Sequence, residues 1–198
     1  VMAQVKPYLK KNTLILSIAA GIPLASLSQW LGEGAQTWPF VVRCMPNTPA
    51  LIGAGAMGLT ALHTVSDAQK AVAHAIMESV GHVVWVASDN EIDAVTALSG
   101  SGPAYVFRFI EALIEGGVAL GLPPEHARSL ALATLSGATQ LAQASDEPLA
   151  ILRERVTSKG GTTAAALDVL AENKFYEIVQ QAMQAAHKRA GELGKLFG

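Results

Sequence analysis

Residues 13–32 read TLILSIAAGIPLASLSQWLG and predict the order strand, tight turn and helix. The first part of this stretch is mostly apolar, as is typical of a strand buried on both faces of a parallel sheet. Small residues follow it. Apolar residues then recur at helical spacing as far as Gly32, a residue type that commonly ends a helix. The stretch therefore predicts one unit of an α/β sheet.

The same alternation extends over residues 1–87. Further strands are predicted at 40–49, 57–62 and 82–87. A helix is predicted at 66–81, with Ser66 capping its start and Gly81 ending it. Because strands and helices alternate, a parallel α/β sheet is expected for this part of the chain.

From Asp89 onward the pattern is helical only. The helix predicted over 123–145 has apolar residues around most of its circumference. Such a helix is normally buried, and a second chain is one way to bury it. Helices are predicted over 89–100, 101–121, 123–145, 147–156, 163–172 and 174–196. A domain boundary is therefore expected near residue 88.

Composition limits the function classes. The net charge is −2, which does not favour a nucleic-acid partner. The single cysteine, Cys44, excludes a disulfide framework and fits a reducing compartment, and the five histidines lack metal-ligand spacing, so no metal is expected. The sequence has no apolar run of the roughly 18–20 residues that cross a membrane. A soluble cytoplasmic protein is expected.

The segment VTSKGGTTAAALDVL, residues 156–170, is the first candidate binding site. Gly160 and Gly161 permit backbone angles closed to other residues, and Thr162 or Thr163 is predicted to cap the following helix. Free N–H groups in the first turn of a helix attract anions such as a carboxylate or a phosphate. The alternative is an ordinary glycine turn without a ligand.

The second candidate lies at the ends of two predicted strands. Ala19, Ala20 and Gly21 follow the first strand, where ligands of open parallel sheets bind, and would let a flat ring approach the backbone. An ordinary tight turn is equally consistent with them. Asn47 in MPNTPA either stabilises its turn or reaches the same crevice.

No acid–base dyad is evident in the sequence. The acidic residues Glu91 and Asp93 are interpreted as a solvated helix start. If the protein is an enzyme, a cofactor is therefore expected to carry the chemistry.

Four motifs together are more specific than any one alone. In order, they are LSIAAGIPLASLSQWLG, VRCMPNTPALIGAG, EIDAVTALSGSGPAYVFRFIEAL and VTSKGGTTAAAL. They resemble the pyrroline-5-carboxylate reductase family over nearly the whole chain. The resemblance implies an α/β plus all-α protein, with residues 1–88 as the C-terminal part of an NAD(P)-binding Rossmann domain. Residues 89–198 would form a helical dimerisation and substrate domain.

The resemblance also implies ligands and partners. The substrate would be 1-pyrroline-5-carboxylate, the cofactor NADPH or alternatively NADH, and the assembly a homodimer or an oligomer of dimers. Thr163 would be the catalytic residue. Substrate would be bound by Ser158, Gly160, Gly161, Thr162 and Asp146. The cofactor would be bound by Ile18, Ala19, Ala20 and Asn47, and by Arg155 from the partner subunit.

One family feature is missing from the sequence. Members of the family carry a glycine-rich dinucleotide fingerprint near the N-terminus, and none precedes Ser17 here. The chain is therefore expected to be a fragment. It would then be inactive alone or serve as a non-catalytic dimerisation module. Another reductase with a Rossmann and a helical domain, of the β-hydroxyacid type, is a further alternative. Such enzymes use a helical lysine, and residues 89–150 contain none.

Overall fold

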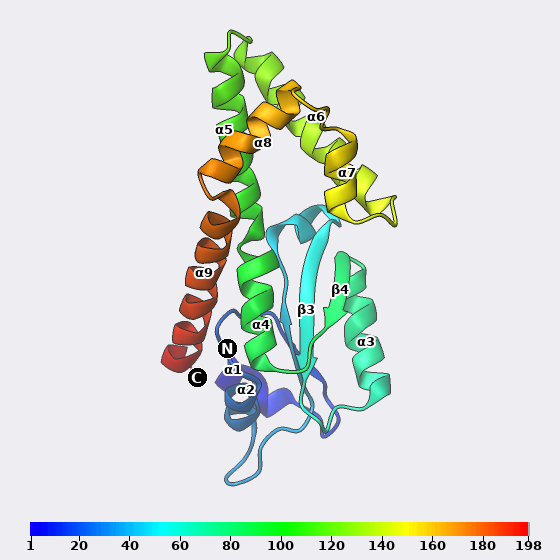
Figure 1. Cartoon of the computed structure of the whole chain (residues 1–198). Helices are drawn as coiled ribbons and strands as arrows, with labels where there is room; N and C mark the ends of the chain where they lie inside the picture. Colours follow the sequence, from blue (N-terminus) through cyan, green and yellow to red (C-terminus); the bar gives the residue numbers. More distant parts are fainter. Residues whose placement is uncertain (198) are drawn as a thin grey trace. The chain divides into compact units, whose positions relative to one another are not determined.

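The computed structural model describes residues 1–197 and divides into two compact units (Figure 1). Val1–Pro103 and the end of the chain from Ala182 form one unit, called here the sheet unit. Ala104–Gln181 form the other, called here the helical unit. Within the described residues, no helix is long and apolar enough to span a membrane.

The sheet unit contains a four-stranded sheet in the order β1-β2-β3-β4. Strands β1 and β2 pair in parallel, as do β3 and β4, whereas β2 and β3 are antiparallel. The antiparallel pair differs from the expected all-parallel sheet. Its cause is the short connection, because a parallel crossover needs about a dozen residues or more. Here residues 46–54 contain only the 3₁₀ turn η2. The bounds are β1 Ile15–Ser17, β2 Val41–Met45, η2 Thr48–Ile52, β3 Gly55–Ala61 and β4 Gly81–Trp85.

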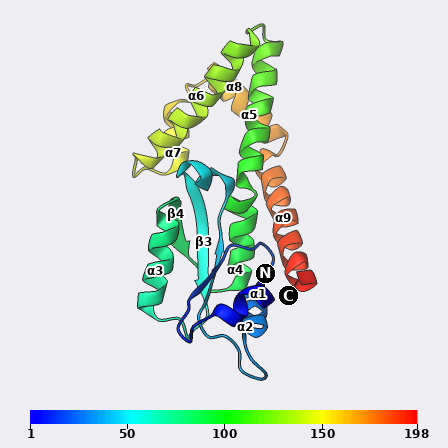
Figure 2. The same cartoon turned by 180° about the vertical axis from the view of Figure 1, so that it is seen from behind.

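Helices cover both faces of this sheet. Figures 1 and 2 show α3 on one side of the sheet and α4 on the other. Val42 and Cys44 belong to the core cluster that includes Ala73 and Met77 of α3. Val41 instead packs with α2 residues, since alternate residues of a strand face opposite sides. The bounds are α1 Met2–Val5, η1 Lys6–Tyr8, α2 Leu24–Leu31, α3 Asp67–Glu78, α4 Asp89–Val95 and the π-helical turn η3 Thr96–Gly100.

The start of α3 was correctly predicted, but its end was not. Ser66 accepts a hydrogen bond from the Gln69 N–H, and the Gln69 side chain accepts one from the Ser66 N–H. Gly81 does not end the helix but begins β4. A Cβ atom there would lie 2.1 Å from the Gly55 carbonyl oxygen, so glycine permits this close strand pairing.

The helical unit buries very little of its own surface. Of its described residues, only Ala127 and Ala131 are buried. The helix predicted over 123–145 is present as α6, but most of its apolar residues are exposed in the single chain. The bounds of the remaining helices are α5 Gly102–Ala119, α6 Pro124–Gln143, α7 Leu149–Arg155, α8 Thr162–Glu172 and α9 Phe175–Phe197. The start of α5 and the part of α9 from Ala182 belong to the sheet unit. The predicted fold class, an α/β sheet followed by helices alone, is confirmed.

Candidate functional site

A cavity of about 600 Å³ lies in the sheet unit beyond the carboxyl ends of β1 and β2. Its walls include Ile18, Met45, Asn47, Leu51 and Gly100, so they are largely apolar. Ile18, the residue after β1, has 62% of its surface exposed. The cavity thus brings together Ile18 and Asn47, two of the residues predicted to bind a cofactor. It also lies where open α/β sheets bind ligands.

Asn47 supports this cavity as well as lining it. Its Nδ2 donates to the carbonyl oxygen of Ser99, 3.0 Å away, and its Oδ1 accepts from the Ala56 N–H at 2.9 Å. The side chain therefore links the end of β2 to β3 and to η3. This agrees with the interpretation of Asn47 as a turn stabiliser, and it leaves the predicted cofactor contact untested.

The loop Ile18–Pro23 connects β1 to α2. The Ala19 N–H donates to Ser17 Oγ at 3.3 Å, whereas Ala20 is exposed, and neither alanine lines the cavity. Gly21 has a φ of +71°, and a Cβ atom there would lie 3.1 Å from Cβ of Leu193 in α9. The positive φ favours glycine at this position, and the close approach of Leu193 leaves little room for a side chain. The last turns of α9 thus support the loop from behind.

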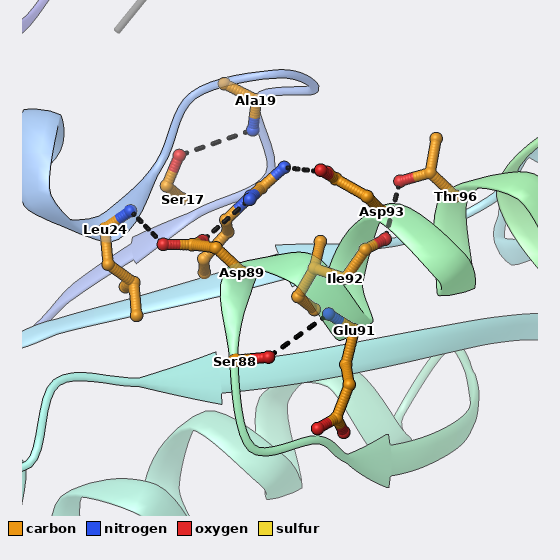
Figure 3. A network of polar contacts seen from close by, with 10 residues as sticks. Ser17, Ala19, Leu24, Ser88, Asp89, Glu91, Ile92, Asp93 and Thr96 are labelled. Atoms are coloured by element: carbon orange, nitrogen blue, oxygen red, sulfur yellow. Dashed lines mark hydrogen bonds and ion pairs between the residues drawn. The ribbon is translucent and has the colours of Figure 1, made fainter. Parts of the chain in front are cut away.

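An ion-pair network centred on a buried arginine lies beside this loop. The Arg43 side chain is 3% exposed; its Nη1 lies 2.7 Å from Asp89 Oδ1 and its Nη2 lies 3.5 Å from Asp93 Oδ1. The second oxygen of Asp89 accepts from the Leu24 N–H at 3.0 Å (Figure 3). One guanidinium and two carboxylates therefore connect β2, α4 and the start of α2.

Sequence reasoning missed this network. The interpretation of Glu91 and Asp93 as a solvated acidic pair was wrong for Asp93, which pairs with Arg43. Glu91 is exposed and accepts from the Ala87 N–H. A signal was present, because residues at i and i+4 of a helix share one face, as Asp89 and Asp93 do. An arginine inside a buried strand needs such partners.

Cys44, the neighbour of Arg43 in β2, points to the opposite face of the sheet. Burial raises the pKa of its thiol to about 12, because the thiolate would lose its hydration. Cys44 is therefore a protonated packing residue near neutral pH and not a nucleophile. Among the described residues, no group of three or more His, Cys, Asp or Glu side chains could hold a metal ion.

In the helical unit, residues 158–161 form a tight turn before α8. The Gly161 N–H donates to the carbonyl oxygen of Ser158 at 3.0 Å, and Gly160 has a φ of +70°. A Cβ atom on Gly161 would lie 2.4 Å from Ser158 Oγ. The backbone angle of Gly160 thus favours glycine, whereas a side chain at Gly161 would displace the Ser158 hydroxyl from its present position.

The predicted threonine cap was wrong. The N-cap of α8 is Gly161, with no side-chain hydrogen bond, and Thr162 and Thr163 lie inside the first turn. The turn carries the chain to Gly161 in an extended conformation and leaves no threonine at the cap position. The first helical bond runs from the Ala165 N–H to the Gly161 carbonyl, so the N–H groups of Thr162 and Thr163 precede the ladder and point out of the helix end.

Two further predicted residues lie on either side of α7, Asp146 before its start and Arg155 at its end. Arg155, predicted to reach a cofactor in the partner subunit, has its Nη2 2.5 Å from Glu147 Oε1, and its side chain is 63% exposed. Asp146, predicted to bind substrate, is exposed and immediately precedes Glu147. The ion pair thus connects the end of α7 to the residue that follows Asp146.

Comparisons with known proteins agree on one family. The family model for pyrroline-5-carboxylate reductase dimerisation matches residues 89–193. A pyrroline-5-carboxylate reductase of Pseudomonas aeruginosa is 49% identical over 97% of this chain and 69% of its own length. The chain spans about two thirds of the length of the curated relatives it matches, 69% and 66% in two of them.

Solved structures give the same result. A pyrroline-5-carboxylate reductase from Coxiella burnetii has a TM-score of 0.89 and 42% identity, covering 96% of this chain and 69% of that one. The pyrroline carboxylate reductase of Plasmodium falciparum, solved with NADP bound, has a TM-score of 0.87 and 34% identity, covering 98% and 76%. The resemblance inferred from the motifs is confirmed, and the chain belongs to the pyrroline-5-carboxylate reductase family.

Proposed function

We propose that the protein reduces 1-pyrroline-5-carboxylate to L-proline, the last step of proline biosynthesis, with NADPH or alternatively NADH as the reductant. The observation that carries this proposal is the apolar cavity beyond β1 and β2 in a chain of this family. The NADP bound by the Plasmodium falciparum relative supports the choice of cofactor.

The cavity fits the reactive end of such a cofactor. Its volume of about 600 Å³ lies within the roughly 300–1,000 Å³ of small-molecule sites. Ile18 and Met45 offer apolar surface to a flat ring, and Ala19 and Ala20 add only small side chains to the loop after Ile18. When bound, the nicotinamide supplies a hydride for the imine carbon of the substrate. The protein's part is to hold the reacting groups in place.

The turn before α8 is proposed to hold the substrate carboxylate. The N–H groups of Thr162 and Thr163 and the positive end of the α8 dipole favour an anion there. The Ser158 hydroxyl is the neighbouring donor, while Gly160 and Gly161 shape the turn. Because the Gly161 N–H is engaged inside the turn, the donors to the substrate are those of the threonines. Asp146 is proposed to lie near the substrate as well.

Thr163 is proposed to hydrogen-bond the ring nitrogen of the imine. An alcohol is a poor acid, so its role is to orient and stabilise the substrate rather than to donate the proton. A protonated imine accepts hydride far more readily than a neutral one. Water or prior protonation of the substrate therefore supplies that proton.

A homodimer, or a larger assembly of dimers, is proposed to complete the site. The support is the exposed apolar surface of the helical unit and the match to a dimerisation family model. Arg155 would then reach the cofactor of the partner subunit. Residues 1–88 and 89–198 are proposed as the cofactor-binding and dimerisation domains, in a cytoplasmic protein.

The test is loss of NADPH absorbance on addition of 1-pyrroline-5-carboxylate. It is run on this chain and on a version extended by the glycine-rich N-terminal segment expected from the family resemblance. Activity in the extended version supports the proposal. A dimer that binds no NADPH in either version would instead support a non-catalytic dimerisation module.

Replacing one threonine tests the proposed site directly. Thr163→Ala is expected to lower kcat about tenfold or more, because substrate orientation is lost, with an unchanged melting temperature. Thr139→Ala is the matched control, since Thr139 lies in α6 with its hydroxyl bonded to the Leu135 carbonyl. Equal kcat in Thr163→Ala and the unmodified protein would contradict the assignment.

A further inference from the structure

Both ends of the loop Ile18–Pro23 lie beside Arg43, one through backbone pairing in the sheet and the other through the Arg43 side chain and Asp89. At the first end, Ser17 is the partner of Arg43 in the parallel β1–β2 ladder, and its hydroxyl accepts from the Ala19 N–H. At the second end, Asp89 accepts from the Leu24 N–H and pairs with Arg43 (Figure 3). Between these two points the loop carries Ile18 into the wall of the cavity.

Stability alone does not account for this arrangement. Removing the Arg43 guanidinium from water costs free energy that its attraction to the partly exposed Asp89 and Asp93 only partly offsets. Apolar residues of similar volume often stabilise as well or better. Val41 and Leu27 pack on the same side of the sheet as Arg43. The strand neighbours of Arg43, Ser17 and Thr60, are buried and uncharged. The charged groups add geometric specificity, because each charge-assisted hydrogen bond has a preferred geometry and so positions the backbone that it binds.

We propose that the Arg43–Asp89 pair is a clamp that positions the loop Ile18–Pro23 and, through Ile18, the reactive ring of the cofactor. Arg43 and Asp89 are positioning residues, because neither lines the cavity. The proposal rests on the proposed function for the identity of the cofactor. Its structural content, that Asp89 holds the start of α2, does not depend on that function.

The two acidic partners of Arg43 differ in whether they also contact the backbone at the end of the loop. Asp89 uses one oxygen for Arg43 and the other for the Leu24 N–H, whereas Asp93 approaches only Arg43. An amide has a single acceptor oxygen, so Asp89→Asn must lose one of its two contacts. Asp93→Asn removes the same charge from the network without touching the loop. It is therefore the matched control.

The experiment compares these two variants in the active form of the enzyme. The measurements are KM for NADPH, KM for 1-pyrroline-5-carboxylate, the dissociation constant of NADPH by fluorescence without substrate, and the denaturant midpoint. Hydrogen exchange of the Leu24 amide is measured without any ligand.

Asp89→Asn is expected to raise the KM and dissociation constant of NADPH about tenfold, because small displacements of positioning groups have large effects. It should also speed exchange of the Leu24 amide, with the KM for the imine little changed. Asp93→Asn should lower the denaturant midpoint by about as much as Asp89→Asn does. It should leave the KM and the dissociation constant of NADPH within about twofold of those of the unmodified enzyme. Equal cofactor constants in the two variants, or changes that only follow the midpoint, would overturn the proposal.

Ser17→Ala probes the other end of the loop and keeps the result decisive if Asp89→Asn fails to fold. It removes one hydrogen bond and no charge, and is expected to raise the KM for NADPH about threefold while the fold is retained. An unchanged KM would count against the clamp. If the unmodified enzyme does not turn over the imine, the proposed function fails. The exchange rate of the Leu24 amide still decides whether Asp89 holds the loop.

Discussion

The two units of this chain differ in how much of their apolar surface they bury within themselves. In the sheet unit, Leu27, Val41, Leu59 and Ile92 are fully buried between the sheet and its helices. In the helical unit, the buried residues are two alanines, while large side chains such as Leu130 remain exposed. The sheet unit thus contains its own core. The helical unit presents the larger part of its apolar surface outward, as expected of a segment that is completed by a second copy.

The first prediction tests whether the sheet unit stabilises itself. Leu59→Ala is expected to lower the free energy of unfolding by about 2–5 kcal/mol, because Leu59 is 0% exposed and its loss leaves a cavity. Denaturant titration of the sheet unit's tryptophan fluorescence measures it. The loss should not depend on protein concentration. A loss that vanishes at high concentration would mean that this core also depends on assembly.

The second prediction tests whether the helical unit depends on a partner. Leu130→Glu, at a residue 57% exposed in α6, is expected to weaken self-association by about 2 kcal/mol or more, because it places a charge in an apolar interface. Analytical ultracentrifugation over a range of concentrations measures the shift. Val72→Glu is the control, at a residue 55% exposed on α3 of the sheet unit. Dissociation by both variants, or by neither, would remove the contrast between the units.

The third prediction concerns the dry interior of the sheet unit. The folded pKa of Cys44, about 12, lies above the 9.0 of an ordinary thiol, so its contribution to stability is complete below pH 9 and is lost as pH rises toward 12. At about pH 10 the loss is on the order of 1 kcal/mol. Unfolding midpoints at about pH 8 and pH 10 measure it. Cys44→Ala should show a correspondingly smaller decline, and an identical decline would contradict burial of the thiol.

The smallest effect is expected in the turn of the helical unit. Lys159→Pro should be neutral or stabilise the protein by about 0.4–1 kcal/mol, because proline suits the position before Gly160 in this kind of turn. Thermal unfolding measures it. Lys159→Ala serves as control by removing the same charge without restricting the backbone. A large rise in substrate KM in both variants would instead identify Lys159 as a ligand of the carboxylate.

Secondary structure could be predicted well because its signals are local. The capping box of α3, the helical periodicity of α5 to α9 and the apolar runs of β1 and β2 each lie within one short segment. A general rule about strand ends pointed to the region of the cavity and to Asn47, whereas Ile18 was named from the family resemblance. The errors were at element ends, at Gly81 and at the cap of α8. At Gly81 the close approach of the Gly55 backbone decides the outcome, and at α8 the turn over residues 158–161 does.

By itself, the sequence determined the elements, their order, the glycine turn before α8 and the family, because each depends on neighbouring residues or on motifs read along the chain. Only the tertiary structure decided the antiparallel pairing of β2 with β3, the partners of Arg43 and the support of Gly21 by α9. Each of these depends on which distant segments come into contact. A buried charge selects its partners by distance and geometry in space, and a one-dimensional pattern does not contain that information.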